Sequence, residues 1–170
     1  MTETHRVIVT GKDQSGKSQV LEDLQVGVSG PGNFSFWQSL QGVSPLDSSA
    51  AKSPTNFFPG ASGTMFRLFS IPAADPEMTP QDLEKLQEWF FNEVGFAGAR
   101  VDTTRHPLMH TTPTLDYVIL LSGEISLLLD RGEPVPLKPF DAVVQRATNH
   151  FWVNTGTTPA LLMSVMVGGA

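Results

Sequence analysis

The sequence contains no cysteine. Disulfide bonds, thiolate nucleophiles, cysteine-ligated zinc and iron–sulfur clusters are therefore excluded. Any bound metal would need ligands from His, Asp, Glu or backbone oxygen. Histidine is also scarce, with four residues in a chain of 170. Few positions can therefore supply an imidazole ligand or an imidazole base.

Basic residues are outnumbered by acidic ones, and the chain has no long apolar segment. Eleven Lys and Arg face 17 Asp and Glu, which gives a net charge of -6, and no run of basic residues could neutralise a phosphate backbone. We therefore expect no nucleic-acid partner. No segment has the length and apolarity of a signal peptide or a membrane span, so we expect a cytoplasmic protein with no membrane partner.

The spacing of turn residues along the chain is typical of an all-β protein. Its length fits a single domain. Short segments rich in apolar and β-branched residues are separated by Gly, Pro, Ser and Asn turns, at the regular spacing typical of a barrel or sandwich. The predicted strands cover residues 5–11, 18–28, 33–40 and 64–72, followed by a run of short strands from residue 116 onward. Residues 44–63 show no period and are predicted to be a loop or cover segment.

One helix is predicted to interrupt the strands, over residues 78–95. Thr79 can cap it, Pro80 suits its first position, and Asp82 suits the positive end of its dipole. The helix has an apolar face and a glycine stop, marked by Leu83, Leu86, Phe90, Val94 and Gly95.

Residues 11–18, GKDQSGKS, match the phosphate-binding pattern G-x-x-x-x-G-K-[ST]. That loop binds phosphate where it opens a long helix on a parallel sheet, and the following residues are too short for such a helix. We therefore interpret residues 13–16 as a hairpin turn and expect no nucleotide cofactor.

Three polar residues in the last third of the chain suggest a metal site. His110 and Asp116 lie in one apolar segment and His150 in another. Residues two apart on a strand share a face, so Thr112 and Thr114 would lie beside His110 and Asp116. Two imidazoles and a carboxylate meet the minimum for a divalent metal with open coordination positions.

Residues 105–168 resemble the small cupins. The family's first motif has His-x-His followed by Glu and Gly; here His110 and Thr112 occupy the two His positions, and Asp116 stands where the family has Glu. His150 matches the second motif's His and is followed by its Asn, Asn154. This resemblance implies a double-stranded β-helix, a jelly-roll barrel, with an N-terminal β extension (residues 1–75), the insertion helix (78–95) and the motif core (105–168).

Further residues are candidates for substrate contact or proton transfer. Arg67 sits in an apolar strand, where a buried guanidinium needs an anion, so it is expected to face solvent or to bind a substrate carboxylate. Thr112, Gln145 and Trp152 are candidate substrate-binding residues, and His106 and Tyr117 are the candidates for proton transfer. His5, on the first strand, is expected to be a surface residue.

The sequence leaves three functions open. The leading one is a metal-dependent enzyme of small-molecule metabolism, which would dehydrate, decarboxylate or isomerise a small oxygenated organic acid or polyketide-like substrate on one divalent metal (Fe, Zn, Mn or Ni). The same three ligands on Fe(II) would instead support dioxygenase chemistry. The third function is small-molecule binding without turnover. Exposed strand edges also predict a homodimer.

Overall fold

The computed structural model describes residues 4–28, 32–40, 42, 46, 58–93 and 97–169. Four strands come first: β1 (Thr4–Lys12), β2 (Ser18–Gly27), β3 (Asn33–Ser39) and β4 (Thr64–Ile71). Three short helical segments follow: α1 (Pro80–Glu88), η2 (Trp89–Glu93) and η3 (Ala97–Ala99). The chain ends with β5 (Thr114–Ser122), β6 (Ile125–Leu129), β7 (Val135–Leu137), β8 (Ala142–Arg146), β9 (His150–Asn154) and β10 (Ala160–Gly168).

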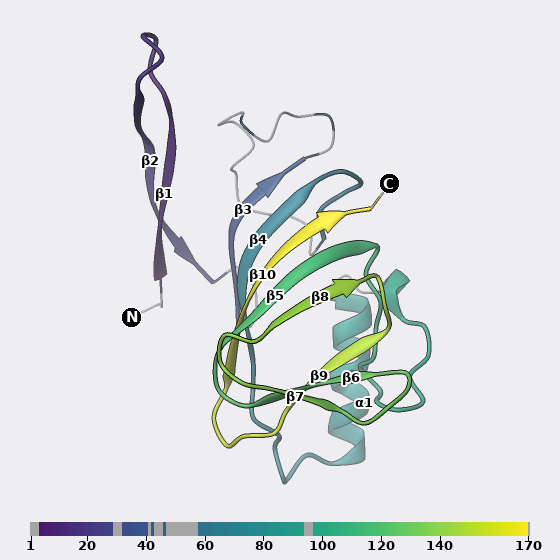
Figure 1. Ribbon diagram of the computed structural model, residues 1–170. Coiled ribbons are helices and arrows are strands. Elements are labelled where there is room, and N and C mark those ends of the chain that lie inside the picture. The colour runs from purple at the N-terminus through teal and green to yellow at the C-terminus, as the bar shows by residue number, and fades with distance from the viewer. Residues whose placement is uncertain are drawn as a thin grey trace.

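Two antiparallel sheets face each other and form the body of the molecule (Figure 1). The larger sheet has the strand order β3-β4-β10-β5-β8, and the smaller one has the order β7-β6-β9. The chain crosses repeatedly from one sheet to the other, as in a jelly-roll barrel. The predicted all-β double-stranded β-helix is therefore confirmed.

The core lies between the two sheets at one end of the barrel. Leu120 and Leu162 of the larger sheet and Ile125 of the smaller one are at most 1% exposed. They belong to a buried cluster that also contains Phe69, Val118, Leu127, Trp152 and Ala160. Strand alternation produces this arrangement, because every second side chain of β5 and β10 points inward. Buried polar residues lie toward the other end, among them Thr112, Asp116 and His150.

Gly123 makes the tight turn between β5 and β6. Its φ of 90° lies in the left-handed region that glycine tolerates. A Cβ atom at this position would also lie 2.6 Å from the Cα atom of Ala160 on β10. The Ser-Gly-Glu sequence therefore lets the chain pass from one sheet to the other close to β10.

The segment that matches the phosphate-binding pattern is a β-hairpin turn. β1 and β2 pair antiparallel on either side of it. The carboxylate of Asp13 accepts hydrogen bonds from the backbone amides of Ser15 (2.8 Å) and Lys17 (2.9 Å), and Gly16 has a φ of 79°. No helix follows the segment, so the hairpin prediction is confirmed.

The predicted helix begins where the sequence indicates, but its regular part is shorter. Pro80 is its first residue, and after Glu88 the chain continues as one π-helical turn, η2. Val94 and Gly95 lie outside the described residues, as does most of the predicted loop at 44–63. In the part of the chain that the structure describes, no helix is long and apolar enough to cross a membrane.

Candidate active site

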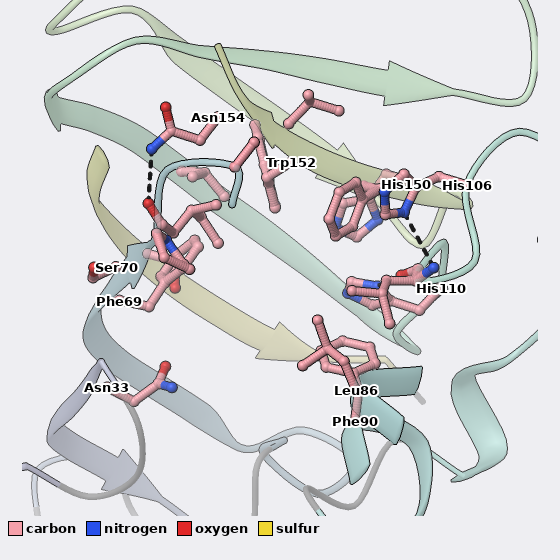
Figure 2. Close-up of a pocket in the computed structure, with 18 of the residues that line it drawn as sticks. Asn33, Phe69, Ser70, Leu86, Phe90, His106, His110, His150, Trp152 and Asn154 are labelled. Atoms are coloured by element: carbon pink, nitrogen blue, oxygen red, sulfur yellow. Dashed lines mark hydrogen bonds between the residues drawn. The ribbon is translucent and has the colours of Figure 1, made fainter. Parts of the chain in front are cut away.

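A cavity of about 550 Å³ opens inside the barrel beside α1 (Figure 2). Its walls come from the inner faces of β4, β5, β9 and β10 and from α1 and η2. Most of the lining side chains are apolar. Seven of the nine residues predicted for the site line this one cavity: Arg67, His106, His110, Thr112, Asp116, His150 and Trp152.

Strand alternation decides which residues of β5 reach the cavity. Thr114 and Asp116 are buried, at 3% and 5% exposure, on the inner face, as predicted for one side of a regular strand. Tyr117 lies on the opposite face and is 49% exposed. It is absent from the cavity wall, so the structure does not bring this predicted proton-transfer residue to the site.

Gln145 is buried but does not line the cavity. Its side-chain amide donates to the backbone carbonyl of Thr148 (2.9 Å) and to the Thr148 hydroxyl. These bonds hold the turn between β8 and β9. The predicted contact of Gln145 with substrate is therefore replaced by a role in this turn.

His110 and His150 lie side by side across an isolated antiparallel bridge. Their backbones exchange two hydrogen bonds of 3.0 and 2.9 Å, and their ring centroids are 4.6 Å apart. The Nδ1 atom of His110 is 2.9 Å from the carbonyl of Leu108, and that of His150 is 2.9 Å from the carbonyl of Thr148. Carbonyl oxygens only accept, so Nδ1 carries the proton and Nε2 the lone pair in both rings.

The environment keeps both imidazoles neutral. Burial, with smaller effects from the neighbouring His150 and the Arg67 charge, lowers the pKa of His110 to about 3. Burial also lowers the pKa of His150. Neutral rings of such low basicity accept hydrogen bonds at Nε2 but are poor bases near neutral pH.

His106 has the opposite tautomer. Its Nδ1 atom accepts a hydrogen bond from the backbone amide of Leu108 at 3.2 Å, so a neutral ring carries its proton on Nε2. The ring is stacked on Phe151, with centroids 3.8 Å apart and planes at 11°. Burial lowers its pKa, which favours the neutral form. His106 is therefore a hydrogen-bond donor in the cavity wall.

Asp116 is the least satisfied polar group of the cavity. Among the described residues its Oδ1 atom has no hydrogen-bond partner, although the atom is buried. The Oδ2 atom accepts a long hydrogen bond of 3.5 Å from the Thr112 hydroxyl. Burial raises the pKa of Asp116, and Thr114, Arg67 and Thr112 oppose this effect only in part. A carboxyl group in such surroundings can exchange a proton nearer to neutral pH than an ordinary aspartate.

Arg67 places a positive charge in the same cavity. Its Nε atom donates to the hydroxyl of Ser164 (3.3 Å), and its guanidinium carbon lies 5.2 Å from the ring centroid of Phe69. Burial lowers its pKa to about 10, although the charge of Asp116 opposes this shift. Arg67 stays protonated at neutral pH. It faces the cavity rather than bulk solvent, which decides between the two predicted positions.

The three predicted metal ligands share the cavity but do not form a three-ligand site. No group of three or more His, Asp or Glu side chains among the described residues is arranged to hold a metal ion. Thr112 occupies the position of the second motif His, and its hydroxyl accepts from Thr114 at 2.7 Å and donates to Asp116. Asp116 is thus hydrogen-bonded to a pair of threonines, and the three-ligand site stays a prediction from the sequence.

One wall of the cavity comes from the helix. Leu83 and Leu86 of α1 and Trp89 and Phe90 of η2 line it, and the ring of Phe90 packs edge-on against His110 at 5.1 Å. The apolar face of the helix was predictable from its spacing, but its contact with the motif core was not. Asn33 and Ser164 also line the cavity, and no sequence signal marked them.

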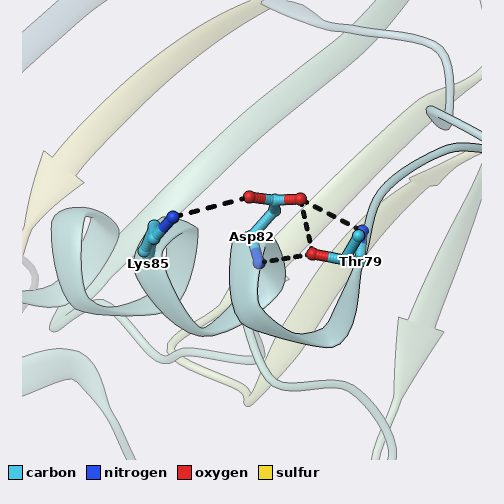
Figure 3. Close-up of polar contacts among 3 residues, drawn as sticks. All are labelled: Thr79, Asp82 and Lys85. Atoms are coloured by element: carbon cyan, nitrogen blue, oxygen red, sulfur yellow. Dashed lines mark hydrogen bonds and ion pairs between the residues drawn. The ribbon is translucent and has the colours of Figure 1, made fainter.

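A capping box fixes the start of α1 (Figure 3). The amide of Asp82 donates to the Thr79 hydroxyl (3.2 Å), and the amide of Thr79 donates to the Asp82 carboxylate (3.3 Å). The predicted cap is confirmed. Further along, the side-chain amide of Gln87 donates to the carbonyl of Pro107 at 3.0 Å. The Gln87 bond holds the helix against the segment that leads to His110.

Asn154 is a structural residue at the far end of the cavity. Its amide donates to the carbonyls of Ile71 (2.9 Å) and Thr158 (2.8 Å), and its Oδ1 atom accepts from the amide of Gly156 (2.8 Å). All its polar atoms are therefore used within the chain. The motif asparagine ties β4, β9 and the turn before β10 together.

The chain is similar over part of its length to proteins named for a biosynthesis cluster and for a cupin domain. The chain is 53% identical over 51 residues to "Phomopsin biosynthesis cluster protein C'" of Diaporthe leptostromiformis, a match that covers 30% of this chain and 27% of that protein. It is 42% identical over 62 residues to "Cupin-domain-containing oxidoreductase srdD" of Neurospora crassa, which covers 35% of this chain and 32% of that protein. The matches thus span about a third or less of the relatives' own length.

A solved structure with a similar arrangement is the Cnp3 cupin domain of Schizosaccharomyces pombe. It has a TM-score of 0.43 and 10% identity, over 99% of this chain and 86% of that one. No protein-family model matches the chain. The strand topology of the molecule and the relatives named for a cupin domain lead to one conclusion: this chain has the cupin fold.

Proposed function

We propose that the chain is an enzyme that moves a proton on a small, largely apolar carbonyl compound, in an isomerisation or dehydration. One observation carries the proposal: Asp116 lines a largely apolar cavity, one of its buried carboxylate oxygens has no hydrogen-bond partner among the described residues, and burial raises its pKa. Native proteins rarely leave such an atom unpaired unless a function requires it.

Asp116 would act as the proton carrier. Its ionised carboxylate takes a proton from the carbon next to the substrate carbonyl. The electron pair of that C–H bond forms a C=C bond, and the π electrons of the carbonyl move onto its oxygen, which gives an enolate. In an unsaturated ketone, return of the proton to the far carbon of the conjugated enolate shifts the double bond and isomerises the substrate. In a β-hydroxy ketone, the enolate re-forms the carbonyl as the C–O bond to the hydroxyl breaks, and the proton from Asp116 converts the departing hydroxide into water. No electron acceptor is consumed in either reaction.

The other polar residues would stabilise the enolate. The guanidinium of Arg67 is the candidate for a hydrogen bond to the enolate oxygen, because it keeps its charge in a cavity of low polarity. His106 would donate from Nε2 to a second oxygen of the ligand. Thr112 would orient Asp116 through its hydroxyl, and Trp152 would supply apolar contact area. With Asp116, five of the residues predicted from the sequence are retained, and Trp152 keeps its predicted contact with the substrate.

A redox reaction is the second candidate. The relative from Neurospora crassa is named an oxidoreductase. In addition, the Nδ1 atoms of His110 and His150 contact carbonyls, and their Nε2 atoms carry the lone pairs that a metal would need. Elemental analysis of the purified protein tests this candidate, because a stoichiometric metal that is lost in His150→Ala would favour it.

Deuterium exchange tests the leading proposal. A panel of cyclic ketones, with 2-tetralone as the first probe, is incubated with the protein in D2O and followed by proton NMR and mass spectrometry. A proton-transfer enzyme accelerates exchange beside the carbonyl, whereas an oxidoreductase converts the probe to an oxidised product. A binder without turnover shifts the probe's NMR signals and leaves the exchange rate at that of buffer, which would contradict the proposal.

A further inference from the structure

The polar residues of the cavity are shielded from solvent. His110, Thr112, Asp116, His150 and Ser164 line it, and each is at most 8% exposed. The cavity of about 550 Å³ has room for a small ligand. A ligand that reaches these residues must pass the part of the wall that separates them from solvent.

The mouth of the cavity lies along α1. Met78, just before the helix, and Trp89, just after it, line the cavity and are 42% and 39% exposed. The wall formed by the strands is different, because its lining residues Phe69, Val118 and Trp152 belong to the buried core. Core residues cannot move aside without disrupting the barrel. The wall that can move is therefore the one on the helix side.

The β1–β2 hairpin also extends away from the two sheets, but it is not part of the mouth (Figure 1). None of its residues lines the cavity. At its base His5 packs on Phe34 and Phe36 of β3, with ring centroids 4.5 and 5.9 Å apart. His5 is therefore a packing residue rather than the surface residue expected from the sequence. The hairpin is fixed to the larger sheet at this point and cannot serve as the moving wall.

Few contacts hold α1 in place. Leu83 and Leu86 face the cavity and are half-buried, and no residue of the helix is fully buried. Among the described residues, one side-chain hydrogen bond joins the helix to the barrel, from the amide of Gln87 to the carbonyl of Pro107 at 3.0 Å. The helix can therefore move away from the cavity without opening the core.

The turn that follows the helix is anchored. Phe91 of η2 is 3% exposed and packs with Ala99, while Phe90 packs edge-on against His110. The backbone amide of Thr111 donates to the carbonyl of Ala99 at 2.9 Å, which ties this cluster to the segment before β5. π-helical turns are frequent at functional sites, and hinge motions are absorbed by a few residues at the end of an element. A loosely held helix thus meets a fixed turn at Trp89.

We propose that α1 is a gate to the cavity, with η2 as its hinge and the hydrogen bond between Gln87 and Pro107 as its latch. Figure 2 shows Leu86 and Phe90 projecting from this segment toward His110 and His150. Opening moves Leu86 away from the cavity and lets a ligand enter. Closing places the apolar face of the helix on the ligand and excludes water. A gate of this kind is independent of the reaction that takes place behind it.

Thiol labelling measures the opening of the gate. The chain contains no cysteine, so a single introduced Cys reports on its own position. Ser164→Cys places a thiol inside the cavity with little change in size. Ser39→Cys is the same substitution at a position that is 1% exposed and does not line the cavity. The rate of alkylation by N-ethylmaleimide then follows the population of the open form.

Loss of the latch should speed labelling inside the cavity alone. In the Ser164→Cys protein, Gln87→Ala should raise the alkylation rate about 5-fold, the factor expected from one neutral hydrogen bond. Gln81→Ala, the same substitution at an exposed position of α1, is the matched control and should leave the rate unchanged. The alkylation rate of Ser39→Cys should respond to neither change.

Thr79→Ala supplies a second way to loosen α1, because it removes the helix cap. It should also speed the labelling of Ser164→Cys, which keeps the test decisive if circular dichroism shows that Gln87→Ala unfolds the barrel. Labelling of Ser164→Cys as fast as that of the exposed Ser15→Cys would overturn the proposal, because the cavity would then be permanently open. So would a rate that neither Gln87→Ala nor Thr79→Ala changes, or an equal acceleration at Ser39→Cys.

Discussion

At the scale of single residues, the cavity contains ionisable side chains whose charged forms are disfavoured by burial. Asp116, His110 and Arg67 each have a pKa shifted toward the neutral form, and burial is the largest cause in all three. Burying such groups lowers the stability of the fold, and proteins commonly keep them where a function requires them. The shifts therefore lead to predictions of stability against pH.

Acid should destabilise the protein through His110. The folded state holds this ring neutral down to a pKa of about 3, whereas an unfolded chain takes up the proton near 6.5. Stability present above pH 6.5 is therefore lost as the pH falls toward 3. At about pH 4.5 the loss from this residue is on the order of 2 kcal/mol. Urea denaturation at neutral and acid pH measures it, and His110→Gln should lose less than wild type. Equal losses would contradict the burial of this ring.

Asp116→Asn should stabilise the protein above neutral pH. The pKa of Asp116 is raised in the fold, so its contribution to stability is present below the unfolded pKa and is lost as the pH rises through the folded pKa. The neutral amide of Asn has no such loss, so the free energy of unfolding should rise by about 0.5–2 kcal/mol, as is typical when a destabilising functional residue is replaced. Thermal melts at alkaline and acid pH measure the gain, which should shrink in acid. A variant less stable than wild type at alkaline pH would show that the carboxylate is satisfied.

The sequence predicted that successive residues of a strand alternate between its two faces, but not which groups each side chain contacts. Asp116 and Tyr117 are neighbours, and only the two-residue period of β5 separates a cavity residue from a surface one. Applying that period strictly would have excluded Tyr117. The role of Gln145 was not predictable, because its partner Thr148 lies across a turn whose geometry the motif does not specify. The hydrogen bond from the Thr112 hydroxyl to Asp116 was not predicted either.

At the scale of elements, local signals were sufficient for the strands and the helix cap. Turn residues separated every strand from β5 to β10, and the resemblance to cupins supplied the fold, whereas the order in which the strands pair comes from the structure. The packing of α1 over the cavity is a long-range contact without such a signal. None of its residues is fully buried, although Leu83 and Leu86 are half-buried at the cavity, so the cap is expected to contribute measurably to its stability.

Thr79→Ala should therefore loosen α1. Loss of an N-cap hydroxyl costs about 1 kcal/mol. Hydrogen exchange followed by mass spectrometry should show that residues 80–88 exchange faster in the variant than in wild type, while the strands exchange at the same rate in both. Lys17→Ala, on the exposed hairpin turn, is the control and should change the free energy of unfolding by less than about 0.5 kcal/mol. Unchanged exchange in α1 would mean that packing, and not the cap, maintains the helix.

At the scale of the whole molecule, the barrel contains two regions. One end is filled by an apolar core, and the other holds the cavity with Asp116, Arg67 and the histidines. Phe69, Val118 and Trp152 belong to both, so the core and the cavity wall are continuous. The inner side of β5 and β10 carries the buried residues of both regions.

The comparison of wild type with Asp116→Asn in the deuterium-exchange assay is the most direct test of the central claim. The amide keeps the size of the side chain but cannot carry the proton, so the exchange rate beside the probe's carbonyl should fall by at least about 100-fold. Glu133→Gln, an exposed loop substitution with the same chemical change, should keep the wild-type rate. An Asp116→Asn variant that exchanges the probe as fast as wild type would contradict the assignment of Asp116 as the proton carrier.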